Sequence, residues 1–98
     1  MILFTKNQWE RAIVLLQRVE LGPVIEENVL MTGFVYPRGR REKSALRQML
    51  IAHKLKNRDL LHKLQRAGYV QNQETRAKDG GRIHRRVWSL TGKPYPID

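Results

Sequence analysis

The stretch Leu60-Leu61-His62-Lys63-Leu64-Gln65-Arg66-Ala67-Gly68-Tyr69-Val70 decides the fold, because a helical pattern meets a strand pattern there at one glycine. Its three leucines recur at the three- and four-residue spacing of one helix face. Glycine is the residue type that most often ends a helix, since it adopts a positive φ without strain. The Tyr-Val pair that follows favours a strand. The stretch therefore predicts a helix that ends near residue 67 and a strand directly after it.

A second strand is predicted further along the chain, so that the two strands form a hairpin. Residues 69–75 are the first strand, and Ile83-His84-Arg85-Arg86-Val87-Trp88-Ser89-Leu90 is the returning one. The Asp79-Gly80-Gly81 segment between them tolerates the positive φ values that tight turns need. We expect Trp88 and Leu90 to face the core, and we expect residues 92–98 to form an extended tail.

Before this region, the sequence predicts one amphipathic helix from about Lys6 to Glu20. Thr5 and Gln8 have the three-residue separation of a capping box, in which each side chain bonds to the backbone of the other residue. Apolar residues then follow at helical spacing, and a Gly-Pro pair at 22–23 ends the helix.

Two segments leave alternatives open. Val29 to Tyr36 reads as a short strand, whereas residues 24–31 read equally well as one or two helical turns. Residues 45–67 contain no Gly or Pro, so one long helix competes with two short ones. Two helices would begin at the N-caps Ser44 and Asn57. The polar residues His53 and Asn57 interrupt an apolar seam, which favours a break near residue 56.

Positive charge is concentrated in one part of the chain. The first 36 residues hold three basic and four acidic groups, giving −1, whereas residues 37–98 hold 16 basic and five acidic groups, giving +11. The sum is the net charge of +10. Such a surface attracts polyanions, and nucleic acid is the most common polyanion that a small basic protein meets.

The segment from Leu60 to Val70, followed by a basic hairpin and then Val87-Trp88-Ser89-Leu90-Thr91, resembles the winged helix-turn-helix family. This resemblance covers about Ala45 to Thr91. It implies an α+β fold, a small winged helix with three helices and a C-terminal β-hairpin wing. The helix from Lys6 would be the family's first helix. Residues 1–98 would form one domain, with a core of about 5–91.

Three basic clusters are the candidate contact residues. The exposed side of the last helix carries side chains that can pair with base edges in the major groove of DNA. These are Arg58, His62, Lys63, Gln65 and Arg66. The hairpin wing carries a second cluster suited to the phosphate backbone: Arg76, Lys78, Arg82, Arg85 and Arg86. A third cluster precedes the helix near residue 44: Arg38, Arg40, Arg41 and Lys43.

The expected function is DNA binding, with double-stranded DNA as the partner. The resemblance implies a small transcriptional regulator or accessory factor of a prokaryote or phage that acts by occupying its site. An alternative is a protein-interaction module of a replication, packaging or secretion assembly. In that case residues 24–36 would contact a protein partner or form a homodimer. RNA binding is a further alternative, which groove shape would separate from DNA binding.

The sequence argues against several other classes. It has no cysteine, which excludes disulfides and thiolate zinc sites. The spacings of its three histidines match no common metal site, and no serine or threonine has a base beside it, so we expect neither a metal, nor a cofactor, nor an enzyme. No apolar run reaches membrane-spanning length and no secretory signal is visible, so we expect a cytoplasmic protein with no membrane partner.

Overall fold

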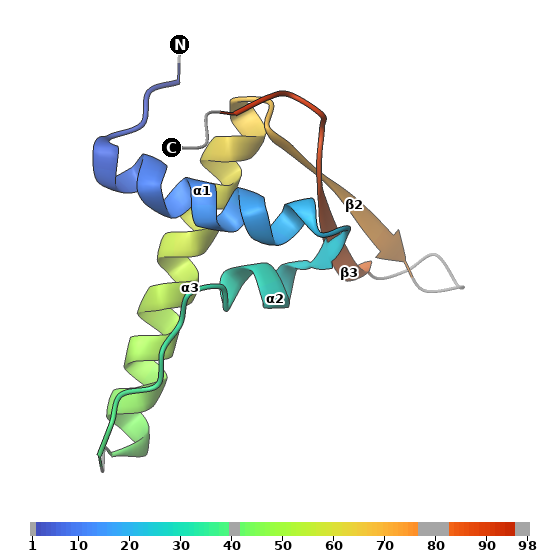
Figure 1. Cartoon of the computed structure of the whole chain (residues 1–98). Helices are drawn as coiled ribbons and strands as arrows, with labels where there is room; N and C mark the ends of the chain where they lie inside the picture. The colour runs from blue at the N-terminus through green and yellow to red at the C-terminus, as the bar shows by residue number, and fades with distance from the viewer. Residues whose placement is uncertain (1, 40–41, 77–82, 96–98) are drawn as a thin grey trace.

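The structure is a computed structural model that describes residues 2–39, 42–76 and 83–95. In these residues the chain forms three helices and one three-stranded antiparallel sheet, which is an α+β fold. The elements in order are α1 (Lys6–Glu20), β1 (Val24–Ile25), α2 (Glu26–Leu30), α3 (Lys43–Arg66), β2 (Val70–Arg76) and β3 (Ile83–Leu90). The helices cover one side of the sheet (Figure 1).

Helix α1 has the predicted bounds and the predicted start. The Thr5 hydroxyl accepts a bond from the Gln8 backbone N–H at 3.1 Å, and the Gln8 side-chain oxygen accepts one from the Thr5 N–H at 3.0 Å. This capping box satisfies two N–H groups that a helix end otherwise leaves without a partner. One face of α1 is buried, at Ala12, Leu15, Leu16 and Val19.

The sheet has the order β1-β3-β2, with β3 in the middle. Val24 lies opposite Trp88 in one pair, and Val70 lies opposite Leu90 in the other. The predicted strands 69–75 and 83–90 are therefore confirmed, and the predicted turn at Asp79 to Gly81 lies outside the described residues. Trp88 is fully buried as expected, and Leu90 is half-buried against the core.

The segment before α3 differs from one prediction. A strand over Val29 to Tyr36 is wrong: Val29 and Leu30 belong to α2, and the short strand is β1. Burial is the reason, because the helical turn places Val29 and Leu30 together in the core. Val35 and Tyr36 remain exposed, at 80% and 65%.

Helix α3 is one continuous helix of 24 residues, so the alternative of one long helix is confirmed and the alternative of two short helices with a break near residue 56 is wrong. Asn57 is not an N-cap but a fully buried residue inside the helix. Ser44 is not an N-cap either, because the N-cap residue of α3 is Glu42, whose side chain makes no capping hydrogen bond. The helix ends as predicted, and Gly68 follows it with a φ of 87°.

The helix continues because its inward polar side chains have partners. Arg11 donates from Nε to the Asn57 side-chain oxygen at 2.8 Å, and the Asn57 amide donates to the Leu30 carbonyl at 2.8 Å. His53 donates from Nε2 to the Thr32 carbonyl at 2.8 Å, and its Nδ1 accepts from Arg11 at 3.0 Å. A buried polar group costs little folding free energy once it is hydrogen-bonded, so the helix tolerates these residues on its inward side. Their hydrogen bonds also join α3 to α1 and to the turn after α2.

The two halves of α3 lie in different surroundings. Its buried residues are Asn57, Leu60, Leu61 and Leu64, all in the second half. The first half, residues 43–56, extends beyond the other helices (Figure 1), although its last residues still contact them: His53 bonds to Arg11 of α1, and Lys54 pairs with Glu27 of α2. We call residues 43–56 the projecting half and residues 57–66 the core half.

Candidate nucleic-acid interface

Helix α3 carries more basic residues than any other described element. It contains seven basic residues and only one acidic residue, Asp59. The basic residues are Lys43, Arg47, Lys54, Lys56, Arg58, Lys63 and Arg66. Lys54 pairs with Glu27 of α2, and Lys63 is half-buried against α1. The other five cations are exposed and make a positive surface on the sides of the helix that do not face the core.

One side of α3 holds exposed groups suited to a duplex. Arg58 and Gln65 are seven residues apart, which is close to two helical turns, and both are exposed. Arg47 lies eleven residues before Arg58, about three turns away on the same side, and is exposed as well. Among the described residues, neither arginine side chain has an ion-pair or hydrogen-bond partner. Both guanidinium groups can therefore contact an external phosphate or base.

Two predicted contact residues of α3 are used inside the protein. The His62 ring meets the Trp88 ring edge-on, with 5.9 Å between their centroids. Lys63 donates to the Gln8 side chain at 2.9 Å, and its ammonium lies 4.8 Å from the centre of the Phe4 ring. Both side chains are half-buried, so they hold α3 against β3 and α1 respectively.

Arg66 lies apart from these two. It is exposed and lines two hollows beside α1, one shared with Lys63 and the other shared with Trp9 and Tyr69. The predicted contact residues of α3 thus divide between two surfaces of the helix. Arg58 and Gln65 lie on one surface, and Lys63 and Arg66 lie beside α1.

The two described arginines of β3 point to opposite faces of the sheet, because side chains alternate along a strand. Arg86 faces the helices, where its guanidinium lies 3.0 Å from Glu74 and 3.6 Å from Glu26. Arg85 is exposed on the other face. For the other predicted wing residues, Arg76 belongs to β2, and Lys78 and Arg82 lie outside the described residues.

Glu26 joins the sheet to α2 through two partners. Besides Arg86, it accepts a bond from the Trp88 indole N–H at 3.3 Å. Arg86 Nε is buried without a hydrogen-bond partner. The two terminal nitrogens make the ion pairs, and moving the guanidinium outward to a phosphate would break both of them. We therefore assign Arg86 to the attachment of the sheet rather than to a ligand.

The third predicted cluster is described only in part. Arg38 is exposed in the segment before α3, and Lys43 is exposed as the first residue of the helix. Arg40 and Arg41 lie outside the described residues. The N-cap of α3 is itself acidic, Glu42, so the exposed cations Arg38 and Lys43, rather than the helix end, favour an anionic ligand here.

Sequence reasoning missed two features of this surface. Arg47 was not selected, although its eleven-residue distance from Arg58 would have placed it on the same side of one long helix. It also missed that three apolar residues of the projecting half are exposed. Met49, Ile51 and Leu55 are exposed at 41%, 50% and 49%.

In the described part of the chain, no three His, Asp or Glu side chains are placed to hold a metal ion. No helix within the described ranges is long and apolar enough to cross a membrane. Comparison of the chain with protein-family models, with curated proteins and with solved structures finds no match in any of the three.

Proposed function

We propose that this protein binds double-stranded DNA, with α3 in the major groove. The observation that carries the proposal is the projecting half of α3, which extends from the body with exposed cations and contains no acidic residue. Its 14 residues span about 21 Å at 1.5 Å per residue. The major groove admits a helix, and arginine and glutamine can pair there with guanine and adenine.

The order of the elements supports a winged-helix arrangement. The chain has three helices, a short strand between the first two, and a C-terminal pair of strands, although the second helix lies at Glu26–Leu30 and not within residues 45–67. In this reading the short α2 is the family's second helix and α3 is the recognition helix. Arg47, Arg58 and Gln65 would face base edges, whereas Arg38, Lys43 and Arg85 would contact phosphates. The proposal extends by resemblance to a small regulator or accessory factor that acts by occupying its site.

The test is a salt titration of binding to random-sequence duplex DNA, measured by fluorescence anisotropy. Each phosphate contact adds about 0.9 to the slope of log affinity against log salt, so the double variant R38Q/K43Q, which removes two proposed phosphate contacts, should lower the slope by about two. The matched variant K6Q/R18Q removes the same charge from α1 and should leave the slope unchanged. Equal loss in both variants, or an affinity that salt does not alter, contradicts the proposal.

RNA binding is separated from DNA binding by competition. A side chain of α3 cannot read the deep, narrow major groove of duplex RNA. Duplex RNA should therefore displace labelled duplex DNA only weakly, and stronger displacement by RNA would transfer the proposal to that partner.

One observation favours a protein-interaction role as the second candidate. Ile51 and Leu55 lie one helical turn apart on α3 and are both exposed, and Val35 and Tyr36 are exposed in the segment before the helix. Exposed apolar surfaces often mark interaction sites. Size-exclusion chromatography with light scattering, with and without DNA, distinguishes the two roles. A homodimer that forms without DNA and that Ile51→Ser and Leu55→Ser dissociate would support the second candidate.

A further inference from the structure

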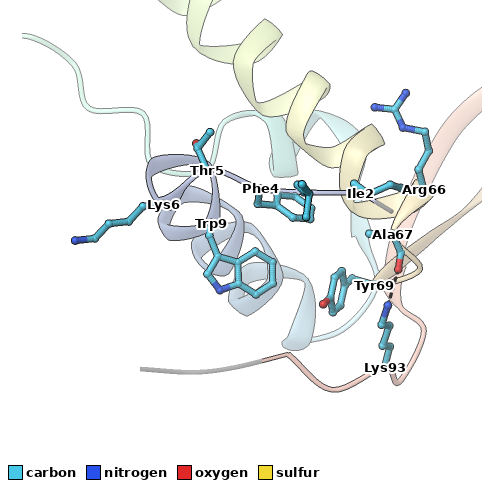
Figure 2. Close-up of a pocket in the computed structure, with 10 residues that line it drawn as sticks. Ile2, Phe4, Thr5, Lys6, Trp9, Arg66, Ala67, Tyr69 and Lys93 are labelled. Atoms are coloured by element: carbon cyan, nitrogen blue, oxygen red, sulfur yellow. Dashed lines mark hydrogen bonds between the residues drawn. The ribbon is translucent and has the colours of Figure 1, made fainter.

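A hollow of about 680 Å³ lies where the N-terminal segment, α1 and the end of α3 meet (Figure 2). Pockets for small ligands usually have about 300–1,000 Å³. Its lining contains three aromatic rings and three cations and no acidic residue. The lining residues are Ile2, Leu3, Phe4, Thr5, Lys6, Trp9, Arg66, Ala67, Tyr69 and Lys93.

The aromatic rings form a row inside this hollow. The Phe4 and Trp9 rings are 5.1 Å apart between centroids, and the Trp9 and Tyr69 rings are 5.7 Å apart. All three rings pack against the core and are only half-buried, so part of each ring remains open to solvent. A flat ring of a ligand can stack on such a surface.

The cations lie on different sides of the rings (Figure 2). Lys93 lies 4.5 Å from the centre of the Tyr69 ring and uses one of its three donors on the Ala67 carbonyl at 2.8 Å. Lys6 and Arg66 are exposed, and neither side chain has a polar partner among the described residues. Core packing explains the burial of the rings, but it does not explain three cations around them without a carboxylate.

We propose that this hollow binds single-stranded nucleic acid, with an unpaired base stacked on Trp9 and the adjoining phosphates held by Lys6, Arg66 and Lys93. Cations on several sides suit a strand that crosses the hollow, because its phosphates continue on both sides of the stacked base. Aromatic stacking combined with positive charge is the usual chemistry of sequence-tolerant single-strand binding. The proposal stands apart from duplex binding, since it uses neither Arg47 nor Arg58.

The test is a titration with an oligothymidylate of about eight nucleotides, a length within the usual range of single-strand sites. Tryptophan fluorescence reports binding, because Trp88 is fully buried and Trp9 lines the hollow. We expect saturable quenching of the unmodified protein, and we expect R66Q to weaken the affinity about tenfold. Binding by W9L, which lacks the reporting ring, is measured by the anisotropy of a fluorescein-labelled oligothymidylate and should also be weakened. The R58Q variant removes the same charge from another side of α3 and should change the affinity less than twofold.

Three outcomes would overturn the proposal. Oligothymidylate does not quench the fluorescence; R58Q and R66Q weaken binding equally; or thymidine monophosphate binds as tightly as the oligomer, which would reassign the hollow to a free nucleotide. R66Q changes an exposed residue, so its result stands even where W9L unfolds. Duplex affinity, measured in parallel, should be the same in R66Q and the unmodified protein, so failure here is distinguishable from failure of duplex binding.

Discussion

The two halves of α3 are made of similar residue types but are held in different ways. The core half buries three leucines and one asparagine, whereas the projecting half buries none of its residues. Apolar side chains occur in both halves, yet Leu61 is fully buried and Leu55 is 49% exposed. A helical apolar pattern therefore does not identify a core by itself, because burial depends on which other elements reach that part of the helix.

The two halves meet at a polar joint formed by Arg11, His53 and Asn57. Here α1 and the turn after α2 both contact α3, and beyond this point only the segment leading into α3 runs alongside (Figure 1). The hydrogen bonds of this joint hold α3 against α1 and the turn after α2, and the projecting half continues from there as the same helix. In the proposed function, this arrangement presents the helix to the groove.

The largest expected effect compares one leucine from each half. Leu61→Ala should destabilise the protein by about 2–5 kcal/mol, because it removes buried methyl groups and leaves a cavity. Leu55→Ala should change the free energy of unfolding by less than about 0.5 kcal/mol, because its side chain is largely in solvent. Urea unfolding followed by circular dichroism measures both values, and similar losses would show that the projecting half is buried in solution.

The next effect tests the joint itself. Asn57→Ala should cost about 2 kcal/mol, because it leaves the Leu30 carbonyl and the Arg11 guanidinium without their buried partner. Asn7→Ala, at an exposed position of α1, is the matched control and should be close to neutral. Equal unfolding midpoints for the two variants would show that the joint contributes no stability.

A smaller effect compares the first turns of two helices. Thr5→Ala removes a capping hydroxyl from α1 and should cost about 1 kcal/mol. Ser44→Ala should cost nothing, because Ser44 lies inside α3 and is not its cap. Thermal unfolding of the two variants checks this difference, and a larger loss from Ser44→Ala would contradict the observed start of α3.

The smallest effect concerns the bond that attaches the C-terminal segment to the end of α1. Tyr95 donates to Glu20 at 3.2 Å, and burial, followed by this bond and the charge of Glu20, raises the pKa of Tyr95 above 10.0. The folded state thus keeps a proton that the unfolded state releases. This contribution to stability is complete below about pH 10 and is lost as pH rises through the folded-state pKa.

Phenolate absorbance during an alkaline titration measures this shift. The difference between the unmodified protein and Tyr95→Phe should titrate above pH 10.0, and Glu20→Gln should move that titration part of the way back. A difference that titrates at or below pH 10.0 would contradict the observed contact between Tyr95 and Glu20.

Local sequence patterns predicted an element correctly wherever residues close in the sequence supply its hydrogen-bond partners. The capping box at Thr5, the end of α3 before Gly68 and the strand from Ile83 to Leu90 depend on contacts a few residues apart or on backbone preference, and all three were predicted. For the candidate contact residues of α3, the sequence predicted which residues are on the helix but not which of them face solvent. The sequence does not show that Lys63 bonds to Gln8, 55 residues away, whereas Arg58 faces solvent.

The sequence by itself determined the positive charge, the α+β class and the bounds of α1 and β3, because these follow from composition and from short-range periodicity. Only the tertiary structure decided that α3 is one helix, that its first half projects, and that Arg86 pairs with Glu26 and Glu74 of the same chain. The physical reason is the same in each case: a polar side chain acquires a buried, paired or exposed role from groups distant in the sequence. Asn57 reads as a helix cap until Arg11 and the Leu30 carbonyl are placed beside it.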